Sequence, residues 1–271
     1  MDARHVPSDT RDRCSVTVII PARNAGADLK LAVSSALRQT RIPQDIFVVN
    51  DGSDDNSTDA MAELGTTVLQ SHGVGAAGAR NAGLARVSTD FIAFLDADDC
   101  WAPRHLDIAL QALERSDACI FAGQAIIIPK NGSGDTGLSR PDLIPVNWGP
   151  YILGRNRIVT SGVVLRRACL GRLRFPDSQK WAEDLSLWVD LAAQGCKLCA
   201  GTTPTVTYFA GTTYRSVDVI RSNARLYWRC LGTHRWNLRA LLGPLLWTSV
   251  TEFRRLRFRY KGPGRVLRSR R

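Results

Sequence analysis

Three carboxylates follow an apolar run near the middle of the chain. Asp96, Asp98 and Asp99 come directly after residues 90–95, DFIAFL, a segment with the composition of a buried strand. Clustered carboxylates repel one another, and a hard divalent cation with oxygen ligands relieves the repulsion. Since side chains alternate along a strand, we expect Asp96 and Asp98 to point to the same side and to hold Mg²⁺ or Mn²⁺ against a diphosphate. A polar turn before a helix that starts near Pro103 would explain the same residues.

A second acidic pair, Glu183-Asp184, stands at the start of a predicted helix over residues 183–194. The helix dipole favours acidic side chains in the first turn, so good capping is a sufficient explanation for the pair. The alternative is a general base at the helix N-terminus, facing a substrate pocket.

Asp51-Gly52-Ser53 follows another apolar run, residues 45–50. In open α/β sheets, ligands bind outside the carboxyl ends of the strands, where a carboxylate can accept a hydrogen bond from a base or a ribose. Asp-Gly-Ser is also a common turn, so the motif alone is a weak signal.

Residues 73–78, GVGAAG, match the dinucleotide-binding pattern GxGxxG, with Asp96 and Asp98 roughly 20 residues further on. That pattern normally opens the first strand–helix–strand unit of its fold, whereas this copy follows the third predicted strand. The turn after the first strand, residues 21–26 (PARNAG), is not glycine-rich. We therefore predict a helix of small residues packed close to the sheet rather than a dinucleotide site.

Short apolar runs alternate with helical segments from Ser15 onward. This alternation predicts an α/β fold with a mostly parallel central sheet, flanked by helices and joined by right-handed crossovers. Residues 1–14 are expected to be a polar leader and residues 129–145 a Gly/Pro/Ser loop. The expected strands are residues 15–21, 45–50, 66–70, 90–95, 118–128 and 160–166, and the expected helices are residues 27–38, a segment ending near 64, 75–86, 103–115 and 183–194.

Composition places the chain among globular proteins. Its 271 residues are 44% apolar and 23% charged, which excludes the disordered, collagen-like and disulfide-scaffold classes. The longest apolar stretch, residues 238–250, contains Arg239 and Pro244 and falls short of the ~20 residues that span a bilayer. A charged N-terminus without a signal-peptide core, and an odd number of cysteines, predict a cytoplasmic protein with reduced thiols. Cys196 and Cys199 form a lone CxxC and are expected to be ordinary thiols.

Positive charge is concentrated at the C-terminal end. Residues 215–271 hold 15 Lys and Arg against 2 acidic residues, whereas the first 214 residues carry a net charge of −2. Arg mixed with Trp and Leu in a predicted helical region is typical of a helix lying on an anionic membrane surface. The alternative is that the aromatic residues pack on the rest of the protein and the arginines face solvent. We find no nucleic-acid-binding motif and predict no nucleic-acid partner, while the C-terminal helices offer a route to homo-oligomers.

Four segments occur in an order that resembles the family 2 inverting glycosyltransferases, which have the GT-A fold. They are SVTVIIPARNAGADLKLAVSSALRQT, DIFVVNDGSDDNST, GVGAAGARNAGLARVSTDFIAFLDADDCW and WAEDLSLWVDLAAQG. The resemblance implies a Rossmann-like GT-A domain over residues 15–214. Its nucleotide-binding half would be about 15–100 and its acceptor half about 101–214, followed by the basic helical region 215–271.

The resemblance also implies roles for individual residues. On the acceptor side, Trp101 and Trp181 are candidates for binding the acceptor. On the donor side, the resemblance places Pro21, Ala22 and Asn24 along the base and ribose, Asp51 at the base and Arg80 at the nucleotide. Asp96 and Asp98 would form the DxD pair that binds the metal and the sugar-nucleotide. Asp184 would be the catalytic base, and Glu183 would support it or touch the acceptor.

The implied reaction is a single in-line displacement. An acceptor hydroxyl attacks the anomeric carbon of a nucleotide-sugar donor, most simply a UDP-sugar, and Asp184 takes its proton, a contribution of ~10²–10⁴-fold. Mg²⁺ or Mn²⁺ offsets the charge on the departing diphosphate. The acceptor would be a cell-envelope glycan or a lipid-linked sugar, and the anomeric configuration would invert.

Two departures from the family pattern leave alternatives open. Asn50 replaces the usual first Asp of DDGS, and residues 207–212 lack the His that many members carry beyond the ED helix. Weaker metal binding, or a non-catalytic nucleotide-sugar-binding module, would follow from these changes. A sugar-nucleotidyltransferase is the other alternative. It would need a glycine-rich basic phosphate loop after the first strand, where residues 21–26 offer only Arg23.

Overall fold

A mixed β-sheet runs through the whole of the described chain. The computed structural model describes residues 13–130, 136–144, 148–154, 156–177 and 182–210, together with Leu226. Within these residues, nine strands form one sheet. They are β1 (Arg13–Ala22), β2 (Ile42–Asn50), β3 (Thr67–Gln70), β4 (Phe91–Phe94), β5 (Cys100–Trp101), β6 (Ile120–Pro129), β7 (Gly137–Leu138), β8 (Val163–Arg166) and β9 (Leu198–Ala210).

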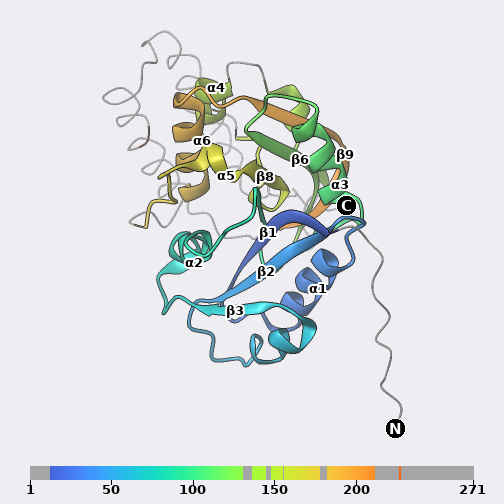
Figure 1. Cartoon of the computed structure of the whole chain (residues 1–271), viewed down its shortest axis with the longest axis vertical. Coiled ribbons are helices and arrows are strands. Elements are labelled where there is room, and N and C mark those ends of the chain that lie inside the picture. The colour runs from blue at the N-terminus through green and yellow to red at the C-terminus, as the bar shows by residue number, and fades with distance from the viewer. Residues whose placement is uncertain are drawn as a thin grey trace, which may run out of the picture.

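Helices cover both faces of the sheet (Figure 1). Helices α2, α4 and α6 lie on one face, and α1 and α3 on the other. The α-helices are α1 (Gly26–Leu37), α2 (Gly75–Leu84), α3 (His105–Glu114), α4 (Trp148–Gly154), α5 (Arg167–Leu170) and α6 (Glu183–Ala193), and the 3-10 turns are η1 (Asp59–Leu64), η2 (Pro141–Leu143) and η3 (Thr160–Gly162).

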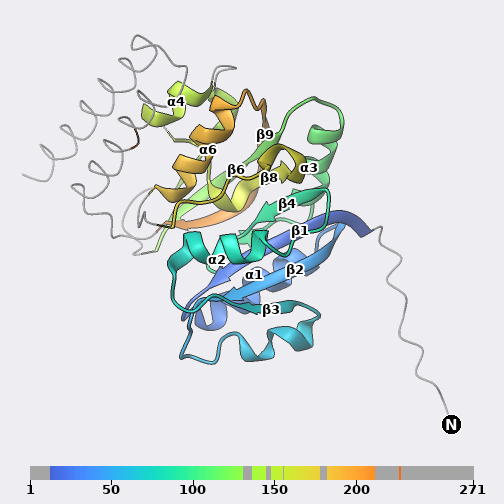
Figure 2. The same ribbon diagram turned by 60° about the vertical axis from the view of Figure 1, so that its left-hand side comes forward.

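Strand order divides the sheet into a parallel half and a mixed half. The order is β3-β2-β1-β4-β8-β6-β9-β5, with β7 paired to β6. Strands β3, β2, β1 and β4 are parallel, whereas β8 runs antiparallel to both β4 and β6. Figures 1 and 2 show the parallel strands β1–β3 with α1 and α2 in the lower part, and β6, β8 and β9 with α3, α4 and α6 in the upper part. The predicted α/β class is therefore confirmed.

Successive side chains of the central strands point to opposite faces of the sheet and pack into two separate cores. In β1, Ile19 joins the core beneath α2 and α6, whereas Val18 and Ile20 join the core beneath α1 and α3. Burial on both faces explains why the strand is a continuous β-branched run rather than an alternating one.

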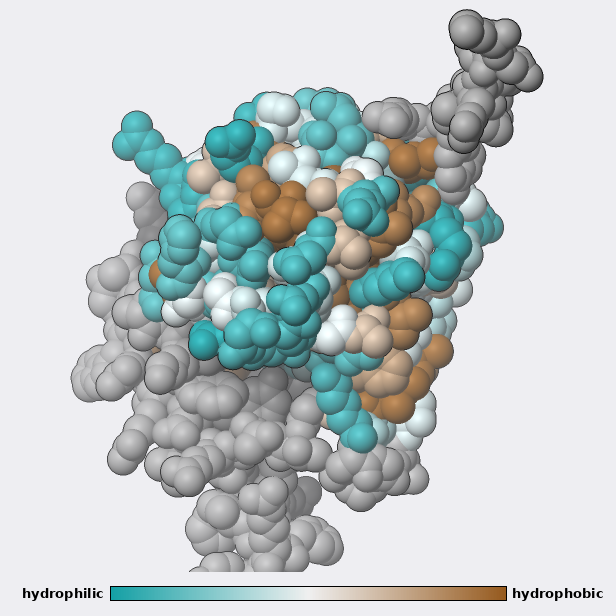
Figure 3. Space-filling model, turned by 90° about the horizontal axis from the view of Figure 1, so that it is seen from below, coloured by the Kyte–Doolittle hydropathy of each residue, from teal (hydrophilic) through white to brown (hydrophobic). Residues whose placement is uncertain are grey.

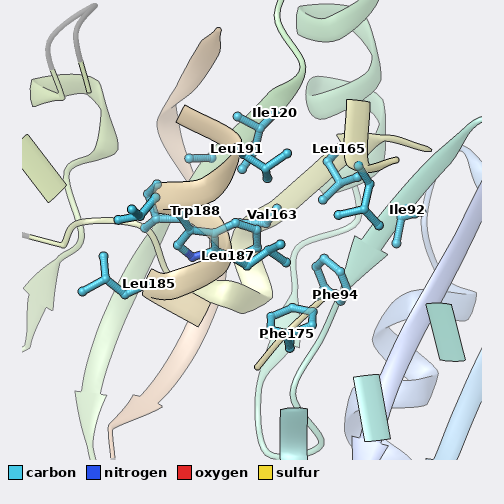
Figure 4. Close-up of a cluster of buried hydrophobic side chains, with 14 of the residues drawn as sticks. Ile92, Phe94, Ile120, Val163, Leu165, Phe175, Leu185, Leu187, Trp188 and Leu191 are labelled. Atoms are coloured by element: carbon cyan, nitrogen blue, oxygen red, sulfur yellow. The ribbon is translucent and has the colours of Figure 1, made fainter. Parts of the chain in front are cut away.

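Helix α6 is anchored by the larger of these cores. Leu187 and Trp188 point from α6 toward Phe94 of β4 and Phe175 (Figure 4). Phe94 and Phe175 meet edge to face, with ring centroids 5.3 Å apart. This packing fixes the start of α6 relative to the end of β4.

The largest difference from the sequence prediction is strand β9. Gly201 and Pro204 interrupt its apolar pattern, and Pro204 pairs with Gln124 where the register with β6 shifts. The helix expected near residue 64 is the 3-10 turn η1, and residues 160–166 divide into η3 and β8. The segment 129–145, expected to be a loop, contains β7 and η2.

Residues 1–12 of the expected leader and the basic region 215–271, apart from Leu226, lie outside the described residues. Arg13 and Cys14, expected to belong to the leader, instead begin strand β1. Leu226 is buried in the same core as α6. None of the helices in the described part of the chain has the length and apolar character of a membrane span. Seen from below, the described surface carries hydrophilic side chains interspersed with apolar patches (Figure 3).

Candidate functional site

The carboxyl ends of β1 and β2 are joined by their loops. The backbone N–H of Asn24 donates to Ser53 Oγ at 3.1 Å, and Asn24 Oδ1 accepts from the N–H of Asp54 at 2.9 Å. The N–H of Gly26 donates to Asp55 Oδ2 at 2.8 Å. These bonds order the loop after β1, so Asn24 is presented in a fixed backbone conformation with φ of 50°. Pro21 and Ala22 form the last two positions of β1 beside it.

Asp51 is buried and tied to the start of α2. Its Oδ1 accepts from Ser71 Oγ and from the N–H of Val74, and its Oδ2 from the N–H of Gly75, each at 2.8 Å. These donors include the first backbone groups of α2, which a carboxylate satisfies well. Asp51 therefore fixes the position of α2, a task that the sequence did not indicate.

Gly83 allows α2 to lie close to the sheet. A Cβ on Gly83 would lie 2.7 Å from Ile19 Cγ2 of β1, which is shorter than real contacts. The glycines of residues 73–78 act differently: Gly73 and Gly75 adopt φ values of 76° and 82°, and a Cβ on Gly78 would meet the Val74 side chain at the start of the same helix. The predicted packing of a small-residue helix on the sheet is confirmed.

Arg80, on α2, connects the end of β4 with the start of α6. Its Nη2 lies 2.6 Å from Asp96 Oδ1, and its Nη1 lies 3.2 Å from Glu183 Oε1. The guanidinium also stacks over the Phe175 ring, 5.3 Å from its centroid. Burial alone would lower the pKa of Arg80, but the charges of Asp96 and Glu183 raise it above its ordinary value. The sequence predicted a nucleotide contact for Arg80, and the structure places it beneath the acidic cluster.

The ED pair lies in the first turn of α6. Asp184 Oδ2 accepts from Thr160 Oγ1 at 3.1 Å, and its Oδ1 accepts from the N–H of Leu185 at 2.6 Å. Burial raises the pKa of Asp184, against the lowering effect of the Leu185 N–H and the Arg80 charge. Burial and the charge of Asp184 likewise raise the pKa of Glu183. A carboxylate with a raised pKa is suited to accept a proton near neutral pH.

The three carboxylates after β4 have separate partners. Strand β4 ends at Phe94, and the N–H of Asp99 donates to the Asp96 carbonyl at 3.1 Å, so residues 96–99 form a turn. The expectation that strand alternation orients Asp96 and Asp98 is therefore wrong. Asp98 forms an ion pair with Lys130 in which both side chains are 40% exposed.

Asp99, by contrast, is fully buried. Its carboxylate accepts from Ser161 Oγ and, at 2.9 Å, from the N–H of Phe209. Burial and the charge of Asp96 raise the pKa of Asp99 to about 8. Asp99 thus ties the turn to β9 and η3 instead of facing the site edge.

Asp96 and Asp98 are the candidate side chains for holding a divalent cation at this site. In the described residues, no group of three or more His, Cys, Asp or Glu is arranged to hold a metal ion. Asp96 and Asp98 keep 26% and 40% of their side chains exposed. Mg²⁺ commonly binds one or two carboxylates together with waters and substrate phosphates, and the two residues fit that arrangement.

Trp101 and Trp181 were the two tryptophans expected to bind the acceptor. Trp101 is only 5% exposed, stacks on His105 at 4.5 Å and donates from Nε1 to the Ser161 carbonyl at 2.6 Å. The structure thus places Trp101 in the core beneath the site. Trp181 lies outside the described residues.

Sequence reasoning missed several residues that organise the site. Thr160, Ser161, Lys130 and Phe175 each contact a candidate residue, although none of the four was itself a candidate. Only the tertiary fold brings them together with the acidic residues.

The chain is similar in sequence to known proteins. A model of Glycosyl transferase family 2 matches residues 17–176. The chain is 31% identical over 180 residues to UDP-Glc:alpha-D-GlcNAc-diphosphoundecaprenol beta-1,3-glucosyltransferase WfgD of Escherichia coli, covering 65% of this chain and 69% of that protein.

Solved structures share the fold at lower identity. S. aureus TarS 1-349 in complex with UDP-GlcNAc has a TM-score of 0.66 at 16% identity, over 85% of this chain and 71% of that one. The mannosyltransferase PcManGT from Pyrobaculum calidifontis, in complex with GDP-Man and Mn2+, has a TM-score of 0.64 at 18% identity, over 91% and 74%.

Proposed function

The chain belongs to glycosyl transferase family 2, and we propose that it is an inverting enzyme that transfers a sugar from a UDP-linked donor to a hydroxyl of a lipid-linked or cell-envelope glycan. The observation that carries the proposal is the Arg80 bridge. It sets Asp96, at the end of β4, beside Glu183 and therefore beside Asp184 at the start of α6. A donor-binding edge and a base with a raised pKa are thus neighbours in space, although they are far apart in sequence.

Asp184 is the general base of this mechanism. An acceptor hydroxyl attacks the anomeric carbon opposite the leaving diphosphate, and Asp184 removes its proton as the new bond forms. One displacement inverts the anomeric centre, so no covalent nucleophile is needed. Glu183, paired with Arg80, supports Asp184 or contacts the acceptor.

The donor would lie along the carboxyl ends of β1, β2 and β4. Pro21, Ala22 and Asn24 would line the base and ribose, with Asp51 behind them. Asp96 and Asp98 would face the diphosphate and hold Mg²⁺ or Mn²⁺, which when bound offsets negative charge on the leaving group. The Mn2+ complex of PcManGT supports a divalent cation, and the UDP-Glc and UDP-GlcNAc of the relatives support uridine.

The acceptor and the location follow from the same relatives. The printed activity of WfgD uses a diphosphoundecaprenol-linked sugar, which supports a lipid-linked acceptor for this chain. Such an acceptor lies in a membrane, so we assign the basic side chains of residues 215–271, 15 against 2 acidic ones, to the anionic inner surface of that membrane, while Leu226 packs in the core with α6. Residues 15–214 would then be the transferase domain.

Asn50 is compatible with catalysis. Its Oδ1 accepts from the N–H of Ser53 at 2.8 Å, and its Nδ2 donates to Thr58 Oγ1 at 3.0 Å. The amide therefore stabilises the turn that carries Asp51 and Ser53. In this proposal Asn50 is a structural residue of the turn and takes no part in the reaction.

A thermal-shift panel of UDP, GDP, dTDP and CDP, each with and without Mn²⁺, tests the proposal. A ligand that binds only the folded state adds ~2.7 kcal/mol at a hundredfold excess over Kd. We expect UDP to raise the melting temperature in the presence of Mn²⁺, and Asp98→Ala to abolish the metal-dependent part. Transfer activity should vanish in Asp184→Asn while the UDP shift remains. No shift with any nucleotide would contradict the proposal, and a UDP shift without transfer would indicate a binding module.

A further inference from the structure

The turn η3 is attached to the segment that follows β4 through Ser161. Ser161 is fully buried, accepts from the N–H of Asp96 at 3.1 Å and donates to the Asp99 carboxylate. Its own carbonyl accepts from Trp101 Nε1 at 2.6 Å. Three hydrogen bonds thus tie η3 to residues 96–101, the donor side of the proposed site.

The preceding residue, Thr160, is attached to the catalytic side. Its side-chain hydroxyl donates to Asp184 Oδ2 at 3.1 Å, and the residue is 6% exposed. The other oxygen of Asp184 accepts from the Leu185 N–H at 2.6 Å. Both carboxylate oxygens are therefore oriented, one by α6 itself and one by η3.

Two facing glycines hold η3 in place on the sheet. A Cβ on Gly162 would lie 2.8 Å from the carbonyl oxygen of Gly123 in β6, and a Cβ on Gly123 would lie 3.1 Å from the carbonyl oxygen of Gly162. The obstacles are backbone atoms, which cannot swing away as a flexible side chain can. The backbone of η3 is thus packed directly against the backbone of β6.

We propose that Thr160 is a positioning residue for the reaction, whose hydroxyl orients the carboxylate of Asp184 relative to the donor side held by Ser161. This inference rests on the proposed role of Asp184 as general base. Thr160 touches no reacting atom itself, and it acts by fixing the direction in which the Asp184 carboxylate faces the acceptor hydroxyl.

The charged groups around Asp184 determine how removal of the Thr160 hydroxyl would change the pKa of Asp184. Arg80 faces it from α2, Asp96 from the turn after β4, and Glu183 from its own helix. Arg80 and the Thr160 hydroxyl favour the charged carboxylate, whereas Asp96 opposes it. Without the hydroxyl, Asp184 should therefore hold its proton to a higher pH.

The test compares four proteins in the full chain: wild type, Thr160→Val, Thr160→Ser and Asp184→Asn. The assay is release of UDP from UDP-glucose with Mn²⁺ and a diphosphate-linked N-acetylglucosaminyl lipid as the acceptor, followed from pH 5 to pH 9. We expect Thr160→Val to lower kcat by about tenfold to a hundredfold, the scale of a misplaced catalytic group, with KM for UDP-glucose nearly unchanged. The acid limb of its kcat profile should move to higher pH, and Thr160→Ser should restore most of the rate.

Thr17→Val is the matched control. Thr17 is a fully buried threonine of β1 whose hydroxyl bonds Thr89 Oγ1 at 2.8 Å, and Thr89 also donates to the Phe91 carbonyl. The Thr17→Val variant should keep the wild-type kcat and the wild-type pH profile of kcat. If Thr160→Val fails to show a UDP thermal shift, Thr160→Ala and Thr160→Ser provide the same comparison.

The outcomes separate the inference from the function on which it rests. Loss of turnover in Asp184→Asn together with wild-type kcat and pH profile in Thr160→Val overturns the positioning role alone. Full turnover in Asp184→Asn, or no turnover of UDP-glucose by wild type, overturns the proposed function and this inference with it.

Discussion

Replacement of Arg80 by methionine should destabilise the protein, and more so at high pH. The side chain is buried and pairs with Asp96 at 2.6 Å and Glu183 at 3.2 Å. Removing one partner of a buried ion pair typically costs ~3–5 kcal/mol, because a charge is left without its counterion. The two carboxylates keep 26% and 19% exposure, so water offsets part of the cost. We expect a loss of about 3 kcal/mol in the free energy of unfolding at pH 8.

The pH dependence follows from the carboxylates that remain. Arg80 lowers the pKa of both Glu183 and Asp184, and burial already raises both. In the variant their folded pKa values rise further, so the carboxyls are protonated at a higher pH than in wild type. A carboxyl group whose pKa is higher in the folded than in the unfolded state stabilises the protein at low pH. This stabilisation is lost as the pH rises through the folded-state pKa. The variant therefore regains stability as the pH falls, and its loss in the free energy of unfolding should be smaller at pH 5 than at pH 8.

Urea unfolding at pH 5 and pH 8 measures this difference. Arg166→Met is the matched control, because Arg166 donates to the carbonyls of Ala118 and Leu113 and lies over the Phe91 ring at 5.3 Å. Its loss should be the same at both pH values, since these partners do not titrate. An equal loss at both pH values for Arg80→Met would refute the electrostatic reasoning and indicate that Arg80 acts through its packing on Phe175.

The other predictions concern the supports of the site and the basic region. Asp51→Asn should lower the free energy of unfolding by about 2 kcal/mol, because an amide NH₂ would face the Gly75 N–H, and urea titration checks this. An unchanged midpoint would contradict the capping role. Gly162→Ala should cost about 1–3 kcal/mol by forcing η3 away from Gly123, with a parallel fall in kcat. The full chain should sediment with anionic vesicles at low salt and be released at high salt, because residues 215–271 carry 15 basic side chains. Binding to neutral vesicles of equal strength would rule out that electrostatic attachment.

Segments with a strong local pattern were predictable from sequence. The run around Ile19 and Ile20, the helix at Glu183 and the small-residue helix with Gly83 all lie where their periodicity and composition placed them. Each of these elements is specified by neighbours in sequence. By contrast, Gly201 and Pro204 hide strand β9 from a propensity argument, because its formation depends on pairing with β6.

The partners of the acidic residues were not predictable. The sequence groups Asp96, Asp98 and Asp99 as one cluster. In the fold, Asp96 pairs with Arg80, Asp98 pairs with Lys130 and Asp99 is buried in the core. Such assignments depend on contacts between residues that are far apart in the chain. The hydrogen bond from Thr160 to Asp184 is invisible in sequence for the same reason.

Transfer by wild type and Asp184→Asn, with UDP-glucose, Mn²⁺ and a diphosphate-linked N-acetylglucosaminyl lipid, tests the central claim most directly. Nuclear magnetic resonance of the product reports its anomeric configuration, and UDP-dependent thermal shift reports binding. We predict a β-linked product from the α-linked donor with wild type, and no product with Asp184→Asn despite an unchanged UDP shift. An α-linked product, or product formed by Asp184→Asn at the wild-type rate, would contradict the account.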